Sequence, residues 1–184
     1  MGWVPAVFLV ISYVNNMLDI LEKVAIRERR EFVKELYKKI FEITKKPKKV
    51  LDLGCGLNPI YFPLKDITYI ACDKEKITLK HVNRHFKKNK IRGEIINKDI
   101  RDAALYKIKK IDITIAFKVF DYLKKEEVKK ILRKINTKWI VISFPTRTIM
   151  GKRMNNPKRK WLEKMVKIHK ILRFHNEVFY IIKK

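Results

Sequence analysis

Acidic residues are scarce in this sequence. Its 184 residues include 19 Asp and Glu against 45 Lys and Arg, which gives a formal net charge of +26. Heat-adapted proteins gain Lys together with Glu, so the shortage of acids argues against ion-pair networks as the reason for the many lysines. Much of the positive charge therefore has no partner within the chain. We expect a polyanionic partner, with nucleic acid favoured over an anionic membrane surface.

Cysteine is also scarce. Cys55 and Cys72 are too few for a disulfide scaffold, and their spacing is not that of a Cys-x-x-Cys metal site. His81 and His85 lie four residues apart, but no carboxylate or third ligand accompanies them, so no metal is predicted. A reduced, cytosolic compartment fits this use of cysteine.

Long hydrophobic runs are missing. The apolar stretch from Val4 to Val14 is shorter than the ~20 residues of a membrane-spanning helix, and no basic residues precede it as in a signal peptide. We therefore expect no membrane association through a spanning helix. The chain is nevertheless 47% hydrophobic and 11% aromatic, which excludes a disordered basic tail. Its length fits one domain.

Apolar periodicity predicts a helical N-terminal segment over residues 1–46 and an α/β domain over residues 47–184. Strands alternating with amphipathic helices are typical of a mostly parallel, doubly wound sheet with helices on both faces. The last two strands form an antiparallel hairpin that turns at His175 and Asn176. The predicted strands are Lys49–Leu53, Thr68–Cys72, Arg92–Asn97, Ile111–Phe117, Lys138–Phe144, Ile171–Phe174 and Val178–Ile182. The predicted helices after residue 47 begin at Asn58-Pro59 or cover Lys76–Lys88, Lys124–Ile135 and Pro157–His169.

A glycine-rich turn follows the first predicted strand. Gly54 and Gly56 allow positive φ angles and the close approach of a ligand. Asn58 is a suitable N-cap, and Pro59 suits the first helical position. A dinucleotide-binding fingerprint would have a third glycine near Pro59. Because that glycine is missing, the turn is better suited to a cofactor without phosphates.

Three carboxylates lie near the ends of neighbouring predicted strands. Asp73 follows Asp52 by 21 residues, at the position where nucleotide-binding α/β folds hold ribose hydroxyls. Asp99 ends the third strand, where it can reach an adenine amino group. An Asp after a strand is otherwise usually a turn former or a helix cap. The ordered set, together with the glycine turn, favours a nucleoside site at the carboxyl edge of the sheet.

On these residues the sequence resembles the S-adenosylmethionine-dependent methyltransferases of the Rossmann-like class. Asp-Leu-Gly-Cys-Gly at residues 52–56 matches their first motif, and the terminal hairpin marks their seven-stranded sheet. The resemblance implies a Rossmann-like fold and S-adenosyl-L-methionine as cofactor, with its methionine part at the glycine turn, its ribose at Asp73 and its adenine at Asp99. The cofactor-binding residues implied within the α/β domain are Asp52, Gly54, Cys55, Gly56, Asp73, Asp99, Ile100, Phe117 and Lys118.

Residues 52–59, 142–147 and 176–181 are similar to a narrower family, the aminoglycoside-resistance 16S ribosomal RNA methyltransferases. These enzymes modify a guanine N7 in the small-subunit decoding region. The resemblance implies that Arg27 or Arg29 contacts the cofactor carboxylate. That family has a longer helical N-terminal region, so we do not expect this chain to dock on an assembled subunit in the same manner. It would act on free RNA or an assembly intermediate, or dock with other surfaces. The Lys- and Ile-rich composition resembles that of archaeal thermophile proteins.

A basic segment follows the fifth predicted strand. From Arg147 to Arg173 it has ten basic residues and one acid, Glu163. Its first part, Thr146–Asn156, is polar, and we expect it to be flexible and to clamp an RNA backbone while a pocket holds one base. Trp161 either stacks on a base or belongs to the core. The expected RNA contacts are Asn58, Pro145, Thr146, Arg147, Lys152, Arg153, Lys158 and Arg159.

The expected activity is RNA methylation, and the favoured target is a guanine N7 of small-subunit ribosomal RNA. N7 has a lone pair and no proton, so the reaction needs orientation rather than a general base. No catalytic acid or base is therefore predicted. Two alternatives remain open: a transfer RNA methyltransferase, and a non-catalytic RNA-binding assembly factor that retains the cofactor fold.

Overall fold

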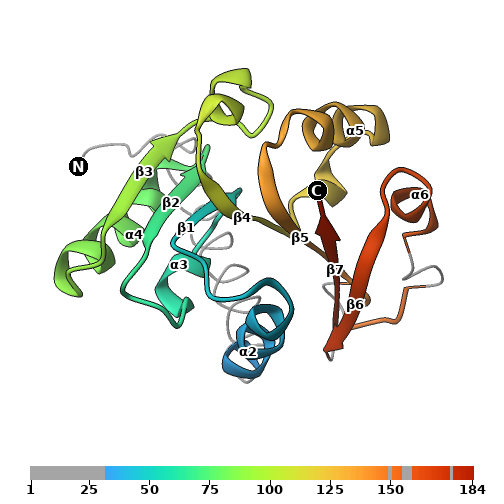
Figure 1. Ribbon diagram of the computed structural model, residues 1–184, viewed down its shortest axis with the longest axis horizontal. Helices are drawn as coiled ribbons and strands as arrows, with labels where there is room; N and C mark the ends of the chain where they lie inside the picture. The colour runs from blue at the N-terminus through green and yellow to red at the C-terminus, as the bar shows by residue number, and fades with distance from the viewer. Residues whose placement is uncertain (1–31, 149–150, 155–158, 175) are drawn as a thin grey trace, which may run out of the picture.

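A seven-stranded sheet organises the chain, with strand order β3-β2-β1-β4-β5-β7-β6 (Figure 1). The structure is a computed structural model, and it describes residues 32–148, 151–154, 159–174 and 176–184. The strands are β1 (Lys49–Leu53), β2 (Thr68–Asp73), β3 (Gly93–Asn97), β4 (Ile111–Phe117), β5 (Thr137–Pro145), β6 (Ile168–Phe174) and β7 (Glu177–Lys183). The α-helices are α2 (Val33–Thr44), α3 (Asn58–Tyr61), α4 (Lys76–Lys88), α5 (Lys125–Lys134) and α6 (Lys160–Glu163), and the 3₁₀ turns are η1 (Ala103–Lys107) and η2 (Phe120–Tyr122).

The direction of the strands confirms the predicted fold class. β1 pairs in parallel with β2 and β4, β2 with β3, and β4 with β5. β7 runs antiparallel to both β5 and β6, which forms the predicted C-terminal hairpin. Because β7 is reversed, it begins at the edge where β4 and β5 end, and Glu177 lies opposite Pro145. This reversal places Glu177, at the start of the last strand, at the same edge of the sheet as the ends of β4 and β5.

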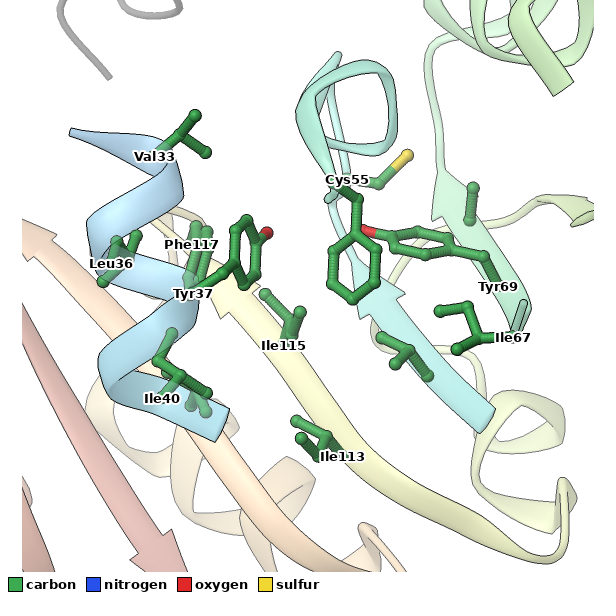
Figure 2. Close-up of a cluster of buried hydrophobic side chains, with 14 of the residues drawn as sticks. Val33, Leu36, Tyr37, Ile40, Cys55, Ile67, Tyr69, Ile113, Ile115 and Phe117 are labelled. Atoms are coloured by element: carbon green, nitrogen blue, oxygen red, sulfur yellow. The ribbon is translucent and has the colours of Figure 1, made fainter. Parts of the chain in front are cut away.

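Apolar layers cover both faces of the sheet. On one face, α2 and α4 pack against alternate strand residues such as Val50, Ile113 and Val141. Figure 2 shows part of this layer, with Tyr37 of α2 near Phe117 of β4. On the other face, α5, α6 and η1 pack against the intervening strand residues. Continuous apolar strands are therefore explained by burial on both sides.

The described part of the N-terminal segment agrees with a helix on the core. α2 buries Leu36, Tyr37 and Ile40 against the sheet and ends at Thr44, before Pro47. Residues 1–31 lie outside the described residues, so a helical segment over the whole of residues 1–46 stays a prediction.

Two local predictions need correction. The helix predicted over Pro157–His169 is wrong in extent, because α6 covers only Lys160–Glu163 and Ile168 already pairs with Ile182 of β7. Pairing with a neighbouring strand has replaced helix formation there. The prediction of Asn58 as the N-cap of the short helix is also wrong. The N-cap of α3 is Leu57, and Asn58 is the first residue of the helix.

In the part of the chain that the structure describes, no helix is both long and apolar enough to cross a membrane. The same residues contain no group of three or more His, Cys, Asp or Glu side chains placed to hold a metal ion.

Candidate functional site

The glycine turn after β1 has the predicted backbone. Gly54 has φ +62° and Gly56 φ +50°, a region that favours glycine. A Cβ at Gly54 would lie 2.5 Å from Val119 Cγ2, so packing as well as conformation requires glycine there. A Cβ at Gly56 would meet no described atom within 4 Å. The turn thus leaves open space beside Gly56, as the close approach of a ligand requires.

Asp73 connects this turn to the loop after β2. Its Oδ2 accepts a hydrogen bond from the Gly56 amide at 2.9 Å, and its Oδ1 accepts one from the Glu75 amide at 3.0 Å. Asn97, at the end of β3, donates from Nδ2 to the Asp73 and Lys74 carbonyls. A carboxylate has about four acceptor sites, so Asp73 can still accept from ribose hydroxyls. Sequence reasoning missed Asn97, whose partners lie on another strand.

Asp52 lies beneath the turn rather than on its surface. Its side chain is fully buried, and its Oδ2 accepts a hydrogen bond from the Tyr69 hydroxyl at 2.6 Å. Burial, followed by the charge of Asp52, raises the pKa of Tyr69. The sequence groups Asp52 with the cofactor contacts, but this position gives its side chain a supporting role. Cys55 is likewise buried, and its amide donates to the Cys72 carbonyl at 2.9 Å.

Asp99 lies two residues after β3 rather than ending it, and it already has a cationic partner. Arg101 donates from Nε to Oδ1 at 2.8 Å and from Nη2 to Oδ2 at 2.6 Å. These hydrogen bonds are the main cause that lowers the pKa of Asp99 to about 2. An adenine amino group at Asp99 would therefore share or displace Arg101, a residue that the sequence analysis missed. Ile100 is buried, and its carbonyl accepts a hydrogen bond from the Tyr106 hydroxyl.

A buried charged group lies where β4, β5 and β7 meet. Lys118 follows β4 with φ +57°, and its amide donates to the carbonyl and hydroxyl oxygens of Ser143 at 3.0 and 3.1 Å. Its Nζ lies 3.4 Å from Glu177 Oε2, and the Ser143 hydroxyl donates to Glu177 Oε1. Glu177 is only 2% exposed. The antiparallel direction of β7 brings Glu177 to this edge, and the predicted hairpin was the only signal for it. Phe117, which ends β4, is buried beside this group.

Three of the expected RNA-binding residues share one small hairpin. The Met154 amide donates to the Thr146 carbonyl, and the Thr148 amide donates to the Lys152 carbonyl. Arg147 forms a β-bridge with Arg153. The exposed basic residues that this folding brings together are Arg147, Lys152 and Arg153.

The base-pocket residues lie beside the hairpin. Pro145 ends β5, and the Thr146 amide donates to the Asn176 carbonyl at 2.7 Å. Both Pro145 and Thr146 are half-buried at the edge. Asn58 is half-buried in the glycine turn, where its amide donates to the Cys55 carbonyl. Their contacts with RNA stay predictions.

Arg159 does not face solvent as expected. Its Nη2 lies 3.1 Å from both carboxylate oxygens of Asp121, and its guanidinium lies 4.9 Å from the centre of the Phe144 ring. Its amide donates to the Tyr180 hydroxyl at 2.9 Å. Its guanidinium is thus engaged in an internal ion pair with Asp121, and the RNA contact expected of Arg159 stays a prediction. Trp161 packs edge-on against Phe144, so the core alternative fits it.

Three further predicted site residues, Arg27, Arg29 and Lys158, lie outside the described residues.

The sheet order with its antiparallel C-terminal hairpin, the glycine turn after β1 and Asp73 at the end of β2 define a Rossmann-like domain with the methyltransferase fold. Residues 13–168 match the model of the ribosomal RNA methyltransferase (FmrO) family, and the chain belongs to that family.

Curated relatives agree with this family. A 16S rRNA (guanine(1405)-N(7))-methyltransferase of Proteus mirabilis is 30% identical over 171 residues, which cover 84% of this chain and 60% of that protein. A protein of the same name from Frankia casuarinae is 25% identical over 130 residues, covering 67% of this chain and 45% of that protein. The chain therefore spans about half of the length of these relatives.

Solved structures share the fold. The 16S rRNA methylase ArmA superposes with a TM-score of 0.73 at 24% identity, covering 99% of both chains. The 16S rRNA methyltransferase RmtF, in complex with S-adenosyl-L-homocysteine, has a TM-score of 0.74 at 19% identity, covering 87% of this chain and 65% of that one.

Proposed function

We propose that this chain transfers a methyl group from S-adenosyl-L-methionine to N7 of a guanine in small-subunit ribosomal RNA. The observation that carries the proposal is the glycine turn joined to Asp73 at the carboxyl edge of the sheet, in a member of a ribosomal RNA methyltransferase family. The names of the curated relatives support the guanine N7 target.

The described residues fit the proposed cofactor. In this proposal the methionine part lies beside Gly56, the ribose donates to Asp73 and the adenine contacts Asp99. The open space at Gly56 and the position of Asp73 against the glycine turn support it. The third glycine of a phosphate-binding turn is absent from the sequence, which suits a ligand without a pyrophosphate. Arg27 or Arg29 would contact the carboxylate of the cofactor.

Orientation is the catalytic contribution that we assign to the protein. Bound S-adenosyl-L-methionine supplies a methyl group on a sulfonium, and guanine N7 accepts it through a lone pair without losing a proton. Lys118, held by Ser143 and Glu177, fixes the corner after β4 next to the acceptor. Pro145 and Thr146 form the wall of the base pocket. Holding the two reacting centres in line supplies several kcal/mol without an acid or a base.

The basic hairpin is the proposed grip on the RNA backbone. Arg147, Lys152 and Arg153 are exposed and lie beside the edge where the base would enter. An A-form major groove is too narrow for a protein pocket, so the target nucleotide must leave its helix. A reduced, cytosolic compartment is part of the proposal, and the free thiols of Cys55 and Cys72 support it.

The decisive experiment is methyl transfer with tritiated S-adenosyl-L-methionine. Small ribosomal subunits, protein-free 16S ribosomal RNA and transfer RNA are incubated separately, and the labelled nucleotide is mapped. We expect label at a guanine N7 of the 16S RNA, and the two ribosomal samples distinguish an assembled subunit from free RNA. Label in transfer RNA alone would overturn the proposed substrate. Binding of cofactor and RNA without any transfer would favour the non-catalytic assembly factor.

A further inference from the structure

Tyr122 is the most exposed large hydrophobic side chain of the described residues. It is 85% exposed, and Ile77, the next, is 62% exposed. Single exposed hydrophobic residues are common on protein surfaces, so exposure alone implies no function. The position of Tyr122 relative to the two parts of the proposed site is what gives it significance.

On one side, Tyr122 is connected to the cofactor turn. It ends η2, four residues after Lys118. Phe120 is buried beneath, and the Tyr122 amide donates to the Val119 carbonyl at 3.3 Å. The side chain of Val119 is the one that a Cβ at Gly54 would collide with. The backbone that presents Tyr122 is therefore packed against the glycine turn.

On its other side, Tyr122 is connected to the basic hairpin. Its neighbour Asp121 holds Arg159 through both carboxylate oxygens. Arg159 Nη2 lies 4.0 Å from the sulfur of Met154, the residue that closes the hairpin onto Thr146. One chain of contacts thus leads from η2 to the hairpin. The turn that carries Tyr122 is therefore linked to the glycine turn through Val119 and to the basic hairpin through Asp121 and Arg159.

We propose that Tyr122 is a stacking platform for a nucleobase of the RNA, the base next to the target nucleotide. This inference rests on the proposed function. When the target leaves its helix, its neighbour loses a stacking partner, and an aromatic face beside a cationic surface replaces that partner without reading the sequence. Tyr122 is 85% exposed, so its ring lies on the surface, and for this reason we assign it the neighbouring base rather than the target itself.

The test compares Tyr122→Ala with Tyr122→Phe by RNA affinity, using fluorescently labelled 16S ribosomal RNA across a salt series. Loss of one base-stacking contact weakens binding by roughly 5- to 150-fold, so we expect Tyr122→Ala to fall in this range and Tyr122→Phe to stay within about twofold of the parent. Because no charge is removed, Tyr122→Ala should lower RNA affinity by the same factor at every salt concentration. The slope of log affinity against log salt should therefore stay unchanged.

Ile77→Ala is the matched control, since it removes the other exposed hydrophobic side chain, and we expect unchanged RNA affinity. Parent-like RNA affinity in Tyr122→Ala would overturn the stacking proposal, as would an equal loss in Ile77→Ala or in Tyr122→Phe. Calorimetry with S-adenosyl-L-methionine separates the two proposals. A parent protein that binds neither cofactor nor RNA refutes the proposed function, whereas intact methyl transfer and RNA affinity in Tyr122→Ala refute only this inference.

Discussion

Gly54 and Gly56 both have positive φ, yet their surroundings differ. A side chain at Gly54 would collide with Val119, whereas one at Gly56 would enter the open space beside the turn. The first glycine is therefore required for packing, and we propose that the second allows the approach of the cofactor. Sequence pattern alone makes the two positions look equivalent.

Alanine substitution separates these two roles. Gly54→Ala should lower the free energy of unfolding by about 2–5 kcal/mol, because backbone strain and overpacking add. Gly56→Ala should cost about 1–2 kcal/mol from strain alone, but should weaken S-adenosyl-L-methionine binding at least about tenfold, an amount equal to 1.4 kcal/mol. Urea unfolding and calorimetry measure the two effects. Equal destabilisation by both variants would contradict the crowding at Gly54.

The two cysteines should be unreactive in the native protein. Burial is the main cause that raises the pKa of Cys55 and raises that of Cys72 from 9.0 to about 12. Both are therefore neutral thiols at pH 8, and iodoacetamide should modify them only after unfolding. Since the native pKa of Cys72 exceeds its unfolded value, its contribution to stability is complete below pH 9 and is lost as the pH rises toward 12. Rapid alkylation of the native protein, followed by mass spectrometry, would contradict this burial.

At the scale of elements, the reversed direction of β7 matters most. A parallel strand in its place would end, rather than begin, at the edge where Lys118 lies. Because β7 begins there, its first residue, Glu177, reaches both Lys118 and Ser143. The hairpin that identifies the fold thus also completes the corner of the site.

Removing the Glu177 carboxylate should lower the free energy of unfolding. Breaking a buried ion pair costs about 3–5 kcal/mol, and because Lys118 is partly exposed we expect about 2–4 kcal/mol for Glu177→Ala. Glu177→Gln keeps an acceptor for Ser143 and should cost less. Urea denaturation measures both, with the exposed Glu126→Gln as a control expected within about 0.5 kcal/mol of the parent. If Glu177→Ala left the free energy of unfolding unchanged, the ion pair between Glu177 and Lys118 would contribute no stability.

The basic hairpin predicts a specific change in RNA binding. Joint Ala substitution of Arg147, Lys152 and Arg153 should reduce the slope of log affinity against log salt by about 2, since each phosphate contact to a single strand contributes about 0.7. Cofactor affinity should stay nearly intact, because the hydrogen bonds described for the hairpin join its own residues and Asn176 rather than the glycine turn. Calorimetry and salt-dependent RNA binding test both statements.

A matched control removes the same charge from exposed lysines of α5, namely Lys129, Lys130 and Lys134. If it lowers the slope as much as the hairpin variant, net charge rather than the hairpin governs binding. Equal loss of cofactor and RNA affinity in the hairpin variant would mean that the hairpin is structural.

Elements determined by local pattern were predicted well, and those determined by distant partners were not. β1, β4 and α4 match the expected bounds residue for residue, because continuous apolar runs and helical periodicity are local properties. The ion pair of Arg159 joins residues 38 apart in sequence, and Ser143 meets Glu177 across 34. The order of the strands in the sheet creates such contacts, and no short sequence motif predicts them. The glycine turn and Asp73 were predictable because their spacing is itself a motif.

For the whole molecule, the net charge of +26 favours long-range attraction to RNA. We expect RNA affinity to fall by a factor of about 10³ or more between 50 and 200 mM salt if six or more phosphates are contacted. Filter binding across this range measures the slope, and a flat response would contradict the polyanion argument. The likeness of the composition to archaeal thermophile proteins stays a prediction.

The carboxylate of Asp73 has a last consequence. Because it already accepts hydrogen bonds from the Gly56 and Glu75 amides, the two loops are held in place before any cofactor binds. Little backbone ordering then accompanies association, so the entropic penalty of binding should be small. Crystals grown without ligand and those grown with it should accordingly show the same main-chain path through both loops.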